Sequence, residues 1–152
     1  HRAALILITG DPGTGKGPLA RKLEHSLFQN NFQSYLLDRR NVNLGVGADL
    51  DDPKSGSESE SARRLGEVAK LFLDAGHVVI STSNAFHQDD QADLRLLANP
   101  YPVVEIQVSS KPTGEPDLVL SVDETQNAEK ASHKIQDFLK EKKILLGHNY
   151  SI

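Results

Sequence analysis

The chain of 152 residues contains no cysteine, no methionine and no tryptophan. The absence of cysteine excludes disulfide bonds, zinc–thiolate sites and thiol nucleophiles. A complete translated chain begins with methionine, whereas this one begins with His1, so we expect the sequence to be a piece of a longer polypeptide. We expect residues 1–152 to form a single domain, because this length suits one hydrophobic core.

Long apolar runs and an excess of positive charge are also lacking. No run approaches the roughly 18 apolar residues of a membrane span, so we expect no membrane partner and a cytoplasmic location. The net charge of −4 argues against a nucleic-acid partner, because nucleic-acid binders usually present a basic surface. The six histidines include no pair at the short helical spacings that metal ligands use, so we predict no metal site.

Strand and helix patterns alternate along the chain. Residues 3–9 (AALILIT) form an apolar run typical of a strand that is buried on both faces of a parallel sheet. Further strands are predicted at 34–38, 77–81, 103–108 and 118–122, and helices near 19–28, 65–76, 88–98 and 128–139. The alternation predicts an α/β fold with a five-stranded parallel sheet between two layers of helices. We expect the acidic, serine-rich residues 49–61 to form a loop.

A glycine-rich segment follows the first predicted strand and opens a helix. Its sequence, GDPGTGK, fits the phosphate-loop pattern G-x-x-x-x-G-K in the context that this pattern requires. Glycines let successive N–H groups face one point, the helix N-terminus adds positive potential, and the lysine brings a full charge. We therefore predict a three-layer P-loop NTPase fold that binds the phosphates of ATP or ADP. The predicted phosphate-binding residues are Gly10, Asp11, Pro12, Gly13, Thr14, Gly15, Lys16 and Gly17.

The position after the lysine departs from the pattern. A phosphate-loop kinase has serine or threonine there, and its hydroxyl holds magnesium, whereas this chain has Gly17 followed by Pro18. We therefore do not expect Mg²⁺ to be held by this position. Gly17 still offers its amide to a phosphate, and Pro18 lacks only an N–H that the first helical turn leaves unpaired. The sequence thus predicts phosphate binding with weakened catalysis.

Three segments carry a family resemblance: GDPGTGKGPLA, DRRNVNLG and RRLGEVAKLFLDAGHVVIS, in that order. Together they resemble adenylylsulfate (APS) kinase, which uses MgATP to phosphorylate the ribose 3′-hydroxyl of APS and gives PAPS. The likeness runs from the first strand to about Ser83, and residues 115–120 (EPDLVL) are similar to the family's last strand. The resemblance implies a nucleotide partner and a homo-oligomer. It also suggests a covalently linked ATP sulfurylase domain, as in fungal ATP sulfurylases.

Several functional positions of the family have changed. The family has D-G-D-N-x-R after the second strand; this chain retains Asp38 and Asn41, but has Arg40 in place of the second acid and Asn43 in place of the arginine. After the third strand Phe86 is retained, and both family arginines are gone. The resemblance therefore leaves Asp38 as the candidate catalytic residue, and Asn41 and Phe86 as candidate substrate residues.

Arg40 has two interpretations. It either acts with Lys16 as a metal-free phosphate clamp or is a solvated loop arginine.

The family's long segment between the fourth and fifth strands closes over both nucleotides. Residues 109–114 (SSKPTG) stand in its place here, so we expect the lid segment to be missing.

Two functions follow from these observations. The first is an APS-kinase-like nucleotide-binding domain of sulfate activation that is catalytically impaired and acts as a structural or regulatory module. The alternative is an active kinase that transfers the ATP γ-phosphate to the 3′-hydroxyl of APS, using Lys16, Asp38 and acids such as Asp89.

Overall fold

The computed structural model describes residues 1–37, 57–83 and 88–146 and contains a five-stranded sheet. The strand order is β2-β3-β1-β4-β5, and every neighbouring pair is parallel. The strands are β1 (Ala4–Gly10), β2 (Ser34–Leu37), β3 (Val78–Ser83), β4 (Val103–Val108) and β5 (Leu118–Leu120). The first strand of the chain is therefore the central strand of the sheet, and the phosphate loop leaves from its carboxyl end.

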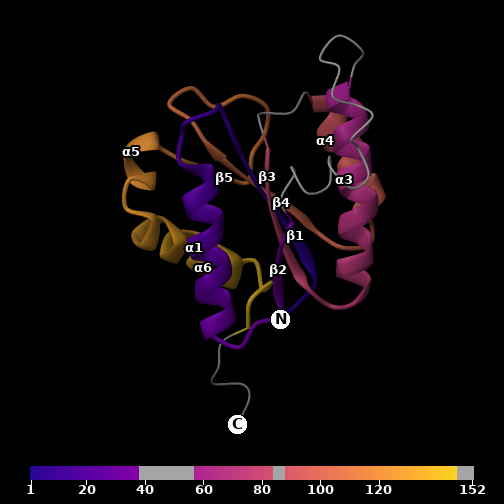
Figure 1. The fold of residues 1–152 in the computed structure, drawn as a ribbon, viewed down its shortest axis with the longest axis horizontal. Coiled ribbons are helices and arrows are strands. Elements are labelled where there is room, and N and C mark those ends of the chain that lie inside the picture. Colours follow the sequence, from indigo (N-terminus) through magenta and orange to yellow (C-terminus); the bar gives the residue numbers. More distant parts are fainter. Residues whose placement is uncertain (38–56, 84–87, 147–152) are drawn as a thin grey trace.

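Helices cover both faces of the sheet. They are α1 (Lys16–Gln29), α3 (Ser57–Asp74), α4 (Gln88–Ala98), α5 (Val122–Thr125) and α6 (Ala128–Glu141). Helices α1, α5 and α6 lie on one side and α3 and α4 on the other (Figure 1), with α1 packed on α6 and α3 on α4. The predicted three-layer α/β fold is thus confirmed. Within the described part of the chain, no helix is long and apolar enough to cross a bilayer.

The central strand joins two hydrophobic cores. All seven residues of β1 are buried. Ile6 and Ile8 belong to the core under α1 and α6, whereas Leu5 and Leu7 belong to the core under α3 and α4. Successive strand residues point to opposite faces, so burial on both faces requires the near-continuous apolar run seen in the sequence.

The end of the last strand differs from the prediction. The strand predicted over 118–122 ends at Leu120, and Ser121 is the N-cap of α5. The Ser121 hydroxyl accepts a hydrogen bond from the Glu124 amide at 3.1 Å, and the Glu124 carboxylate accepts one from the Ser121 amide at 3.0 Å. This reciprocal pair is a capping box. The S-x-x-E spacing was therefore a readable signal for a helix that the sequence analysis missed.

The acidic, serine-rich segment is also partly helical. Residues 57–61, predicted as loop, form the start of α3, whereas residues 49–56 lie outside the described residues. Serine and glutamate are favourable at a helix N-terminus, where serine can cap and acidic groups suit the positive end of the helix dipole. A prediction based on composition alone was therefore wrong for residues 57–61.

The connection between β4 and β5 is short and tied down. Residues 109–117 join the two strands and contain no helix. The Gln107 side chain donates to the Thr113 carbonyl at 2.9 Å and accepts from the Thr113 amide at 2.8 Å. The Ser109 amide donates to the Leu120 carbonyl at 3.0 Å. This short connection stands where the sequence analysis expected the family's lid segment to be missing.

Candidate phosphate-binding site

The phosphate loop connects the end of β1 to the beginning of α1. Gly15 is the N-cap of α1 with φ of 92°, a left-handed conformation that favours glycine, and no side chain caps the helix there. Gly13 also has a positive φ, 82°. The backbone therefore turns sharply and presents the α1 N-terminus toward the loop. An uncapped helix N-terminus of this kind attracts anions through its amide groups and its dipole.

Lys16, the first residue of α1, extends its side chain back over the loop. Its ammonium group donates to the carbonyl of Gly10 and, at 3.3 Å, to the carbonyl of Asp11. The loop thus combines helix amides with a full positive charge within one turn of chain. Together these groups can stabilise a polyphosphate.

Close packing holds the loop in this shape. A Cβ atom on Gly10 would lie 2.6 Å from the Val108 carbonyl oxygen, and one on Gly15 would lie 3.0 Å from the Thr125 hydroxyl. The buried Thr125 hydroxyl lies 2.8 Å from the Thr14 carbonyl oxygen and 2.6 Å from its helical partner, the Val122 carbonyl. Helix α5 therefore supports the loop. The sequence analysis did not identify Thr125, since nothing in the local pattern places it there.

Gly17 lies in the first turn of α1 and carries no hydroxyl. A Cβ atom at this position would meet the Arg21 guanidinium at 3.5 Å, an ordinary contact, so packing does not require glycine. Among the described residues, no group of three or more histidine, aspartate or glutamate side chains is arranged to hold a metal ion.

The remaining predicted site residues, Asp38, Arg40, Asn41 and Phe86, lie outside the described residues. The strands that lead toward them are described. Leu37, at the end of β2, pairs with Ser81 of β3, and Ser83 pairs with Thr9 of β1. The carboxyl ends of these three strands therefore share one edge of the sheet. The described ends of β2 and β3 thus lie at the edge where the phosphate loop begins.

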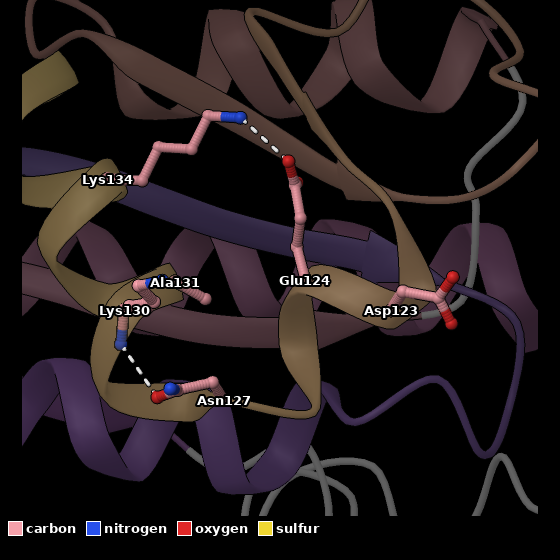
Figure 2. A pocket seen from close by; sticks show the side chains of 6 residues that line it. All are labelled: Asp123, Glu124, Asn127, Lys130, Ala131 and Lys134. Carbon is pink, nitrogen blue, oxygen red and sulfur yellow. Dashed lines mark hydrogen bonds and ion pairs between the residues drawn. The ribbon is translucent and has the colours of Figure 1, made fainter.

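A hollow of about 570 Å³ lies between α5 and α6 (Figure 2). Across it, the Lys134 ammonium lies 3.0 Å from the Glu124 carboxylate, and the Asn127 side chain accepts from the Lys130 amide at 3.1 Å. The hydrogen bond from Lys134, and then the one from the Ser121 amide, lower the pKa of Glu124 below its ordinary value. The helix that carries Thr125 is thus held by charge as well as by its cap. The hollow is lined by Asp123, Glu124, Asn127, Lys130, Ala131 and Lys134.

Two loop glycines allow a matched test of loop packing. Alanine at Gly13 or Gly15 must adopt a positive φ, which costs about 1–2 kcal/mol. Only at Gly15 does the new Cβ also meet Thr125, whereas nothing lies within 4 Å of it at Gly13. We expect Gly15→Ala to lower the melting temperature and the affinity for ADP more than Gly13→Ala, as measured by calorimetry. Equal losses in both variants would contradict the supporting role of Thr125.

The Glu124–Lys134 pair predicts a pH dependence. A lowered carboxylate pKa stabilises the fold above the unfolded-state value, and this stabilisation is lost as the pH falls through the folded-state value. Lys134→Ala should raise the Glu124 pKa toward 4.5 in an NMR titration. Its melting temperature should fall below that of the wild type at pH 6 and converge with it in acid. Lys130→Ala, one turn earlier on α6, is the control, and an unchanged Glu124 titration in Lys134→Ala would refute the pair.

Known proteins resemble this chain in sequence. The family model described as adenylylsulphate kinase matches residues 2–115. The adenylyl-sulfate kinase of Geotalea uraniireducens is 39% identical over 108 residues, covering 71% of this chain and 51% of that protein. That of Shewanella pealeana is 40% identical over 106 residues, covering 70% and 51%. The chain thus spans about half the length of the curated relatives it matches.

Solved structures share the fold. An APS kinase mutant from Mycobacterium tuberculosis superposes with a TM-score of 0.82 at 26% identity, covering 91% of this chain and 98% of that one. A hexameric APS kinase from Thiobacillus denitrificans gives a TM-score of 0.76 at 22% identity, covering 95% and 30%. With the family match over residues 2–115 and the phosphate loop at the carboxyl end of the central strand, the chain belongs to the adenylyl-sulfate kinase family.

Proposed function

We propose that this chain is a nucleotide-binding domain of sulfate activation that holds the polyphosphate of ATP or ADP while phosphoryl transfer is impaired. The arrangement of Gly15 and Lys16 carries the proposal: an α1 N-terminus without a side-chain cap, and an ammonium group extended over the same loop. The predicted binding residues, Gly10 to Gly17, supply these groups. The family's relative from M. tuberculosis has been solved in complex with AMPPNP and APS. In this chain the domain would serve as a structural or regulatory module.

Three features of the chain support impaired phosphoryl transfer. Gly17 offers no hydroxyl for magnesium, Arg40 replaces an acid of the family pattern, and residues 109–117 form a short connection held by Gln107 in place of a lid. A missing general base or a missing contact to the transferring phosphate typically costs a factor of about 10² to 10⁴ in rate. Such losses overlap when residues act as a unit. Together they still predict turnover well below that of a working kinase.

The names of the similar curated proteins favour the alternative function, an active kinase. Curated proteins named adenylyl-sulfate kinase match this chain at 35–40% identity. An active domain would transfer the ATP γ-phosphate to the 3′-hydroxyl of APS, with Lys16 on the phosphates and with Asp38 and acids such as Asp89. Asn41 and Phe86 would contact the substrate.

Further properties belong to the same proposal. Arg40 would act with Lys16 as a phosphate clamp that needs no metal. The proposal also includes a linked ATP sulfurylase domain, self-association of the chain and a cytoplasmic location. Self-association is supported by the hexameric assembly of the T. denitrificans APS kinase.

Binding and turnover assays distinguish the two functions. We expect calorimetry to show ADP binding that changes little when EDTA replaces magnesium, because no side chain of the loop provides a metal ligand after Lys16. A coupled assay with MgATP and APS should show turnover well below about 1 per second, the lower end of ordinary kinase rates. Turnover at or above that rate would support the alternative, and failure of ADP and ATP to bind would refute both.

Gly17→Ser tests the magnesium argument directly. The side chain fits without strain, and its hydroxyl stands where P-loop kinases hold magnesium. We expect the ADP affinity of this variant to increase severalfold when magnesium is added, as measured by calorimetry. Gly17→Ala provides the control, because it adds the same Cβ atom without a hydroxyl. If both variants respond to magnesium like the wild type, the interpretation of Gly17 is wrong.

A further inference from the structure

The two faces of the sheet differ at its carboxyl end. On the α1 and α6 face, the apolar layer continues to the ends of the central strands, with Ile8 of β1 and Val108 of β4. On the α3 and α4 face, apolar residues give way to buried polar ones, among them Thr9, Glu105 and Gln107. The register places Thr9 opposite Gln107 on neighbouring strands. The polar layer therefore lies beneath α4, directly before the point where the phosphate loop begins.

Glu105 is the centre of this layer. Its side chain is only 2% exposed, and a buried carboxylate is costly unless donors surround it. One of its oxygens accepts from the Thr9 hydroxyl at 2.7 Å and from the Gln107 amide at 3.5 Å. The other accepts from the side-chain amide of Gln91. Each oxygen therefore has a donor from a different element of the fold.

The elements joined by Glu105 both lead to the proposed site. Thr9 directly precedes Gly10, whose carbonyl accepts from Lys16. Gln91 lies in the first turn of α4, the helix that follows the segment containing Phe86. A single buried carboxylate thus links the strand that carries the phosphate loop to the helix that follows the predicted substrate segment.

We propose that Glu105 is a positioning residue that sets the phosphate loop relative to the start of α4, and so keeps the loop in the shape that binds a polyphosphate. The inference rests on the proposed function, because it concerns the same nucleotide site. Glu105 acts through Thr9, because the hydrogen bond between them fixes the last side chain before the loop. Hydrogen bonds to charged groups are stronger than those between neutral groups. The Thr9–Glu105 hydrogen bond can therefore hold the beginning of a loop whose glycines make its backbone easy to distort.

A second tie on α4 provides a control. Arg95, at the other end of the helix, donates to the Val103 carbonyl at 2.8 Å and lies 3.5 Å from the Asp117 carboxylate. These contacts hold α4 against β4 and touch neither Thr9 nor the side chain of Glu105; Asp117 bonds only to the Glu105 backbone, whose amide donates to its carboxylate at 2.8 Å. Arg95→Ala should therefore loosen the helix and lower stability while leaving the loop in place.

The experiment compares Thr9→Val, Thr9→Ser and Arg95→Ala in the full chain. Valine keeps the shape of threonine and removes the hydroxyl, whereas serine keeps the hydroxyl. We expect Thr9→Val to weaken ADP and pyrophosphate binding about tenfold by calorimetry, the size of one charge-assisted hydrogen bond. Thr9→Ser and Arg95→Ala should stay within about twofold of the wild type, even where Arg95→Ala lowers the melting temperature as much as Thr9→Val does.

The outcomes separate the two proposals. Suppose that the wild type binds ADP. If Thr9→Val then binds within twofold of it, or if Arg95→Ala loses as much affinity as Thr9→Val, the positioning role is overturned and the proposed function stays intact. Absence of wild-type binding would overturn both. If Thr9→Val does not fold, Glu105→Gln serves in its place, since it keeps the side-chain size and sets an amide donor against donors. Retained ADP affinity in that variant would equally overturn the role.

Discussion

The burial of β1 on both faces of the sheet is the constraint on which the site depends. Strands flank β1 on both sides and helices cover both faces of the sheet, so this strand is fixed in position up to Gly10, where the phosphate loop begins. The chain leaves beside β4, where the Gly10 backbone passes so close to Val108 that a Cβ atom would clash. The turn that follows delivers the N-terminus of α1 to the same edge. The anion-binding geometry is thus a consequence of how the central strand is packed.

Binding a phosphate and transferring it make different demands on this loop. Binding needs backbone amides and a cation, which Gly15 at the helix cap and Lys16 provide. Transfer also needs groups that stabilise charge in the transition state, such as a magnesium ion or a base. At Gly17 the chain retains an amide and lacks a hydroxyl. A domain can therefore lose catalysis by side-chain substitutions that leave its backbone site in place.

Contacts between distant parts of the chain hold the loop on two sides. Thr125 of α5 supports it from one side, and Glu105 holds the preceding residue, Thr9, on the other. Glu105 also reaches Gln91 of α4, and among the described strand residues the buried polar groups Thr9, Glu105 and Gln107 lie on the face that α4 covers. A buried carboxylate with satisfied donors specifies one arrangement of its neighbours, because any shift leaves a charge unpaired.

The sequence by itself determined whatever depends on neighbouring residues. An apolar run located β1, helical periodicity located α1 and α6, and the glycine pattern located the phosphate loop up to Lys16. Local signals were overlooked at Ser121, where a capping box begins α5. They were also overlooked at residues 57–61, which were predicted as a loop from their composition and form the start of α3. Only the tertiary structure brought Thr125 to Thr14, 111 positions away, and Glu105 to Thr9, 96 positions away. Such pairings depend on strand order and helix packing, and no local pattern encodes them.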